Sequence, residues 1–156
     1  MARFGSSNIH LWGPEGTIKR YAGPADIIED FFVARLKFYE LRKEALQKRL
    51  GAAVRELANK HRFAGMVVDG SLVLFRKSRA EVEAALTALA FDVHPERGGF
   101  QYLLGTSIVD FTAERLAELK SKLEARAAEL QKLQQMTPRM LWKEDLRQLR
   151  DGLVQR

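Results

Sequence analysis

Tyrosine can act as a covalent nucleophile, and the sequence holds three of them, Tyr21, Tyr39 and Tyr102. Tyr21 follows Lys19 and Arg20, so it could meet a phosphate group. It lacks the nearby acidic metal site and the arginine partner that cleavage would need. Tyr39 falls within a seam of apolar residues and Tyr102 within an apolar cluster, where packing or an interface is the expected role. We therefore predict that none of the three is catalytic.

The other side chains that could do chemistry are not grouped in a catalytic pattern. His10, His61 and His94 are far apart and have no partner at the spacing of metal ligands. No glycine-rich loop follows the Walker pattern, and no serine stands in a nucleophile elbow. The absence of cysteine excludes disulfides, thiolate metal sites and cysteine nucleophiles. We predict that this segment has no catalytic residue, no metal site and no cofactor of its own.

The charged residues favour binding over catalysis. The 26 basic residues outnumber the 20 acidic ones, which gives a net charge of +6. Such a surplus attracts polyanions such as DNA, RNA or anionic lipid, but its sign carries no sequence specificity. The acidic residues are interleaved with lysine and arginine, as they are on solvated helix faces. On charge alone, nucleic-acid contact and simple solvation are equally well supported.

The length and composition of the chain indicate what kind of fold must position these residues. A chain of 156 residues suits one domain with one core. With 46% hydrophobic and 29% charged residues it is expected to be soluble and folded. No apolar run reaches the ~18 residues of a membrane span, and Gly, Ser and Asn occupy the first ten residues where a signal peptide would be apolar. The absence of cysteine fits an intracellular protein.

The N-terminal residues predict a pair of strands followed by a helix. Ile9, Leu11 and Ile18 are apolar at alternating positions around the turn residues 13–16. A lone strand pair is only marginally stable, so neighbouring structure is expected to support it. Gly23-Pro24 then begins a helix, because proline is favoured at the first helical position.

Two long helices carry heptad seams. The seam of the first helix consists of Leu36, Tyr39, Lys43, Leu46, Leu50, Ala53 and Leu57. The seam of the second, for which Thr112 is the expected N-cap, consists of Leu116, Leu119, Leu123, Arg126, Leu130 and Leu133. Thr137-Pro138 begins a last helix. Because each helix can bury its seam against the seam of the other, the two are predicted to form an antiparallel coiled coil.

The residues between these helices predict a compact tip. Asp69-Gly70 separates two apolar runs, 66–68 and 72–75, and this pattern predicts a β-hairpin. Residues 79–90 predict a short amphipathic helix, and large apolar side chains are common beyond it. The predicted fold is mainly α with small β elements. It is a long antiparallel two-helix coiled coil with a small α+β globular tip and an N-terminal strand pair.

Six stretches follow one another in a recognisable order. Residues 8–21 match N-M-H-L-F … G-x-I-K-K-Y, and residues 27–43 match I-L-x-x-F-F-x-x-R-L-x-x-Y-x-x-R-K. Further matches are Arg62-Phe63, Asp69-Gly70, Tyr102-Leu103-Leu104 for Y-L-L, and residues 137–146 for S/T-P-x-x-L-W-x-x-D-L. In this order they resemble eukaryotic-type DNA topoisomerase II (type IIA), in the C-terminal coiled-coil arm and exit gate of its breakage-reunion region. The resemblance covers nearly the whole chain.

The chain also departs from the family pattern. The loop from His94 to Phe100 is short where many relatives carry a long acidic insert. Residues 105–109 stand where relatives usually have a Met-Pro-(Leu/Ile)-Trp stretch. The family's ATPase, Toprim and catalytic-tyrosine domains would precede Met1, so we expect either an excised fragment or a separately encoded piece of a split enzyme.

The resemblance implies four segments and a function. The segments are a strand pair from the end of the preceding domain (1–22), the first coiled-coil helix (23–64), the globular tip or exit gate (65–111), and the return helix with a final short helix (112–156). In the family two such arms meet at their tips. The implied function is the exit-gate and dimerisation segment of an ATP-dependent type II DNA topoisomerase, which passes one duplex through a transient double-strand break. The segment alone is expected to be non-catalytic.

The resemblance also implies site residues and partners. The expected dimer interface consists of Tyr102, Leu103, Leu104, Ile108 and Phe111. The residues expected to face DNA are Lys19, Arg20, Arg35 and Lys37. Expected partners are a second copy through the tip, DNA, and the missing domains in cis or as a separate subunit, with no membrane. The parent enzyme is expected to use ATP and Mg²⁺, in the nucleus if the source is eukaryotic and otherwise inside the cell with DNA.

Two other functions remain open from the sequence. A free-standing coiled-coil scaffold or adaptor fits the heptads and the lack of catalytic residues. A basic helical nucleic-acid-binding protein would bind tightly, with an affinity that falls steeply as salt rises.

Overall fold

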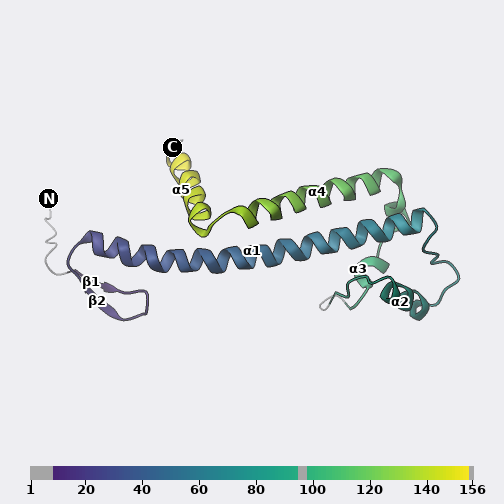
Figure 1. Cartoon of the computed structure of the whole chain (residues 1–156), viewed down its shortest axis with the longest axis horizontal. Coiled ribbons are helices and arrows are strands. Elements are labelled where there is room, and N and C mark those ends of the chain that lie inside the picture. The colour runs from purple at the N-terminus through teal and green to yellow at the C-terminus, as the bar shows by residue number, and fades with distance from the viewer. Residues whose placement is uncertain (1–8, 95–97, 155–156) are drawn as a thin grey trace. The chain divides into compact units, whose positions relative to one another are not determined.

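The computed structural model describes residues 9–94 and 98–154, and most of them are helical (Figure 1). In chain order the elements are β1 (Ile9–Trp12), β2 (Ile18–Tyr21), α1 (Pro24–Val68), α2 (Arg79–Ala88), α3 (Gln101–Leu104), the 3-10 helix η1 (Ile108–Phe111), α4 (Ala113–Gln135) and α5 (Pro138–Val154). The predicted class, mainly α with small β elements, is confirmed. The chain divides into two compact units. Unit 1 is Met1–Leu46 with Gln135–Arg156, and unit 2 is Gln47–Gln134.

The predicted N-terminal strand pair is present in unit 1. β1 and β2 are antiparallel, with Ile9 opposite Tyr21 and Trp12 opposite Ile18. The Gly13 amide donates to the Thr17 carbonyl at 2.8 Å and closes the turn. Tyr21 is buried, and its hydroxyl donates to the Asp30 carboxylate on α1 at 2.9 Å. This bond ties the hairpin to α1, which supplies the support that a lone strand pair needs.

The helices begin where the sequence predicts. Pro24 is the first residue of α1, and Pro138 is the first residue of α5. The hydroxyl of Thr112 accepts the Arg115 amide at 3.3 Å, so Thr112 caps α4 as expected. Thr137 caps α5 in the same way, accepting the Met140 amide at 3.2 Å.

The burial of side chains follows the predicted heptads. Every seam position of α1 is buried or half-buried, and Tyr39 and Leu50 are the buried ones. The seam of α4 is half-buried or buried as well, except that Arg126 is exposed. Within unit 2, Lys60 and Ala64 line a cavity of about 360 Å³ together with Arg115 and Leu119. The first turns of α4 therefore lie beside the last turns of α1, as an antiparallel pair requires.

Unit 2 has its own hydrophobic core, which gathers the end of α1, α2, α3 and the segments between them. Its buried members are Phe63, Leu72, Val82, Leu86, Phe91, Phe100 and Leu103. α2 begins with a capping box. The Ser78 hydroxyl accepts the Glu81 amide at 3.3 Å, and the Glu81 carboxylate accepts the Ser78 amide at 2.7 Å.

The predicted β-hairpin at residues 66–75 is wrong. α1 continues through Val68, so the first of the two predicted strands is its last turn. Gly70 adopts a positive φ of 78° just beyond this helix, which is typical of a glycine that ends a helix. The Leu72 amide donates back to the Met66 carbonyl at 2.8 Å. The Asp-Gly pair therefore ends α1 and does not connect two strands.

Candidate interaction surfaces

The three tyrosines act in packing. Tyr21 donates to Asp30 at 2.9 Å, Tyr39 to Asp145 at 2.6 Å, and Tyr102 to the Asp92 carbonyl oxygen at 2.7 Å. Burial raises the pKa of all three phenols, and the carboxylates beside Tyr21 and Tyr39 raise it further. A raised pKa disfavours the phenolate, whereas a nucleophile needs a lowered pKa or an adjacent base. Across residues 9–94 and 98–154, no three His, Asp or Glu side chains are arranged to hold a metal ion.

An aromatic cluster joins α1 and α5 within unit 1. Trp142 packs against three rings of α1, with centroid separations of 6.2 Å to Phe31, 5.2 Å to Phe32 and 5.8 Å to Tyr39. One turn further along α5, Asp145 accepts the Tyr39 hydroxyl and an ion pair from Arg42. The hydrogen bond from Tyr39, followed by that from Arg42, lowers the pKa of the Asp145 carboxyl. The cluster fixes the register of α5 on α1.

The four residues expected to face DNA differ in their freedom to bind a phosphate. Lys19 is committed to Asp30, with its Nζ atom 2.6 Å from the carboxylate. Arg20 and Lys37 are exposed and form no ion pair within the described residues. Arg35 is exposed, and its guanidinium lies 5.3 Å from the centre of the Tyr39 ring. Arg20, Arg35 and Lys37 therefore remain able to meet a polyanion, and Lys19 is the least available.

A cavity of about 810 Å³ lies in unit 1 between the β1–β2 turn and α1. Its lining mixes apolar side chains, among them Val33, Phe38 and Leu41, with Lys37 and Asp30. No nucleophile and base converge on it, since Asp30 is already bonded to Lys19 and Tyr21. The cavity gives no reason to assign a catalytic function.

The residues expected at the dimer interface belong largely to the core of unit 2. Leu103 is fully buried, with 0% of its surface exposed. Tyr102, Leu104 and Phe111 are half-buried and pack against the core cluster. Ile108 lies in η1, and its side chain is outside what the structure describes. Leu103 therefore fills the core, and the exposed parts of Tyr102, Leu104 and Phe111 are what remains available to a partner.

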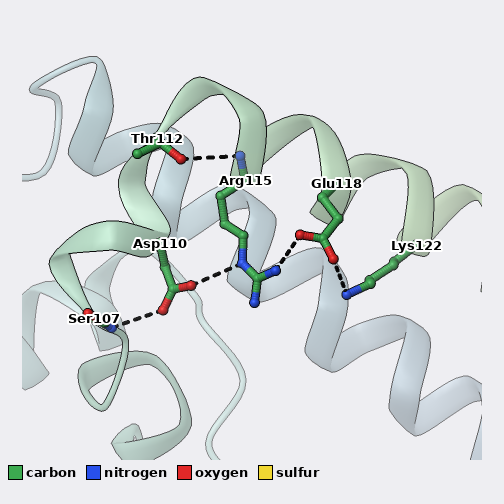
Figure 2. A network of polar contacts seen from close by, with 6 residues as sticks. All are labelled: Ser107, Asp110, Thr112, Arg115, Glu118 and Lys122. Atoms are coloured by element: carbon green, nitrogen blue, oxygen red, sulfur yellow. Dashed lines mark hydrogen bonds and ion pairs between the residues drawn. The ribbon is translucent and has the colours of Figure 1, made fainter.

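A polar network holds η1 and α4 together (Figure 2). Asp110 accepts the Ser107 amide at 3.1 Å and pairs with the Nε atom of Arg115 at 3.0 Å. Arg115 also pairs with Glu118, which in turn pairs with Lys122 at 2.5 Å. The hydrogen bonds from Lys122 and Arg115 lower the pKa of Glu118. This network was not predicted from the sequence, although its spacings of three to five residues around a helix start could have suggested it.

The loop after α2 is held against α1 by contacts that were also not predicted from the sequence. The Arg62 guanidinium lies 3.8 Å from the centre of the Phe91 ring and donates to the Leu89 carbonyl at 2.7 Å. Asn59, which is buried, donates to Asp92 at 2.9 Å. These long-range contacts attach the small helical part of unit 2 to α1.

Among the described residues, no helix is both long and apolar enough to cross a bilayer.

Comparisons with known proteins point to one family. The family model for the A subunit of DNA gyrase/topoisomerase IV matches residues 2–147. The chain is 28% identical over 180 residues to DNA topoisomerase 2 of Arabidopsis thaliana, a match covering 92% of this chain and 12% of that protein. It is 32% identical over 165 residues to DNA topoisomerase 2-alpha of Gallus gallus, covering 90% of this chain and 11% of that protein. The chain thus spans only 11–12% of the length of these relatives.

The fold is similar to that of a solved structure, described as the Plasmodium falciparum topoisomerase II DNA-binding, cleavage and re-ligation domain. The TM-score is 0.86, the match covers 98% of this chain and 24% of the other, and 23% of the aligned residues are identical. At that identity the likeness concerns the fold.

Proposed function

This chain belongs to the family of the DNA gyrase/topoisomerase IV A subunit, and we propose that it is the exit-gate and dimerisation segment of an ATP-dependent type II DNA topoisomerase. The observation that carries the proposal is the family match over residues 2–147, which includes nearly all of both units. Such an enzyme passes one duplex through a transient double-strand break in another. In this proposal the segment provides the contact between two subunits and the opening and closing of the exit gate. Other domains of the enzyme break and rejoin the DNA.

The arrangement of unit 2 supports a gate. α1 has 45 residues, which at 1.5 Å per residue is about 68 Å of continuous helix. At its C-terminal end the core cluster gives the small helical part of unit 2 a fixed shape. A rigid end on a long helix suits a contact between two copies that must hold while the DNA is broken and then part. We propose that two copies meet through this part of unit 2, with Tyr102, Leu104, Ile108 and Phe111 near the contact.

The basic residues of unit 1 support contact with DNA. Arg20, Arg35 and Lys37 are exposed cations on β2 and the first turns of α1. Exposed lysine and arginine side chains bind phosphates without regard to sequence, which suits an enzyme that handles any duplex. We propose that these three side chains face DNA and that Lys19, already paired with Asp30, contributes less.

The remaining components belong to the parent enzyme. We propose that it uses ATP and Mg²⁺, held by ATPase, Toprim and catalytic-tyrosine domains present in cis or as a separate subunit. We propose that it works in a compartment that contains DNA, which is the nucleus if the source is eukaryotic.

Activity of the native protein tests the proposal. An antibody raised against the 156-residue chain is used to capture the native protein from its source, and the captured material is assayed on supercoiled DNA with ATP and Mg²⁺. We expect relaxation that requires both additions, whereas the recombinant chain alone relaxes nothing. Captured protein that is pure, intact and unable to relax DNA would contradict the proposal and favour the scaffold or adaptor function.

A further inference from the structure

The segment that follows α1 has two faces. Leu72 is buried in the core cluster and Leu74 packs against that cluster. The residues that alternate with them are exposed, Val73 by 51% and Phe75 by 79%. A period of two is typical of extended chain with one face on a core. Here the other face is also apolar, and we name it the outer face, consisting of Val73 and Phe75.

Three successive backbone amides of this segment, after that of Leu72, form no hydrogen bond within the described residues. The amides of Val73, Leu74 and Phe75 donate to no acceptor among the residues that the structure describes. Directly after Phe75, Arg76 adopts φ = 62°, a left-handed conformation that is uncommon and strained for a residue other than glycine. A strained residue therefore stands directly beside an exposed phenylalanine, and strained backbone of this kind clusters at binding and switch regions.

We infer that a second copy of this chain covers the outer face, so that Val73 and Phe75 of the two copies pack together about a two-fold axis. The inference rests on the proposed function and specifies its contact surface. A two-fold contact requires a self-complementary patch. Asp69 lies before the outer face and the cations Arg76 and Lys77 lie after it. If the two segments run antiparallel, the anion of each copy lies opposite the cations of the other.

The size of the outer face suits a contact that must open. A phenylalanine side chain presents about 200 Å², so the exposed part of Phe75 is roughly 160 Å² in each copy. Two such faces bury much less than the ~1,200 Å² of a stable interface. Phe75, which is more exposed than Val73 and larger, would be the energetic centre of the contact.

The absence of cysteine permits a direct test on the full 156-residue chain. Phe75→Cys introduces a single thiol, which can form a disulfide only if the two Cα atoms come within about 4.4–6.8 Å. Val93→Cys is the matched control, since Val93 lies in the same unit and is 59% exposed. Both variants are oxidised mildly and followed on non-reducing gels. In parallel, sedimentation velocity measures the dimer dissociation constant of the wild type, Phe75→Ser and Val93→Ser.

We expect Phe75→Cys to cross-link at least tenfold faster than Val93→Cys, and Phe75→Ser to raise the dissociation constant at least tenfold with an unchanged circular dichroism spectrum. If the wild type dimerises but Phe75→Cys cross-links no faster than the control and Phe75→Ser binds normally, the inference is overturned and the gate uses other residues. If the wild type stays monomeric at every concentration, the dimerisation part of the proposed function fails together with the inference.

Discussion

Removing the Tyr39 hydroxyl tests whether the contact between α1 and α5 depends on charge. Tyr39 is buried, and its hydroxyl donates to the Asp145 carboxylate at 2.6 Å. A hydrogen bond to a charged group contributes roughly 1.5–3 kcal/mol when it is well buried. The Asp145 side chain is 36% exposed, so water screens and partly replaces the bond. We expect Tyr39→Phe to lower the free energy of unfolding of unit 1 by about 1 kcal/mol at pH 7.

The loss should depend on pH in a defined direction. The hydrogen bond from Tyr39 is the largest cause of the lowered pKa of Asp145. A carboxyl group whose pKa is lower in the folded state stabilises the fold above its ordinary pKa, and this contribution disappears as the pH falls through the folded value. The difference between wild type and Tyr39→Phe should therefore be nearly constant from pH 7 to about pH 5 and shrink below about pH 4.

Urea unfolding measures the difference, with fluorescence of Trp142 as the probe because its ring lies 5.8 Å from that of Tyr39. The other tryptophan, Trp12, is replaced by phenylalanine in all samples. Tyr102→Phe is the control, followed by circular dichroism, since its hydroxyl donates to a neutral carbonyl. Its loss should be similar at pH 7 and at pH 3. A Tyr39→Phe variant as stable as the wild type at pH 7, or a loss that persists unchanged at pH 3, would refute a charge-dependent contact.

Three further outcomes are expected. Leu86 is fully buried in the core of unit 2, so Leu86→Ala should cost about 3 kcal/mol in urea unfolding, and a loss below about 1 kcal/mol would mean that this core is loosely packed. Ser78→Ala removes the α2 cap and should cost about 1 kcal/mol, whereas Ser78→Gly should cost only a few tenths; equal losses would exclude capping as the cause. In fluorescence-anisotropy titrations with duplex DNA, Arg20→Ala combined with Lys37→Ala should reduce the slope of log affinity against log salt by up to about 2. Lys19→Ala should change that slope less because Lys19 is paired with Asp30. An equal change would contradict the proposal that Lys19 contributes less to DNA contact than the other basic residues.

The helical framework was predictable because burial repeats with the heptad. Seam positions from Leu36 to Leu57 are buried or half-buried as expected, and only periodicity was needed to find them. Arg126 is the exception, exposed where the repeat expects burial. The hairpin prediction failed because Asp-Gly serves both a hairpin turn and the end of a helix, and local sequence does not distinguish the two.

The candidate contact surface was less predictable for a different physical reason. Leu103 and Phe75 are both large and apolar, yet one is fully buried and the other is 79% exposed. The hydrophobicity of a side chain predicts that it avoids water. It does not predict whether the core of the same chain or a partner protein covers that side chain. The bond between Tyr39 and Asp145 joins residues 106 positions apart, and finding it requires the register of α5 on α1.

The continuity of α1 through both units limits how the length of this chain can change. One residue inserted near Gly51 would rotate every later seam side chain by about 100° about the helix axis and move it by about 1.5 Å along that axis. These side chains would then no longer face the partner helix. An insertion of seven residues nearly restores the direction, with a drift of about 20°, but it also requires a matching insertion in α4. Single-residue insertions and deletions should therefore be rejected in α1 and α4.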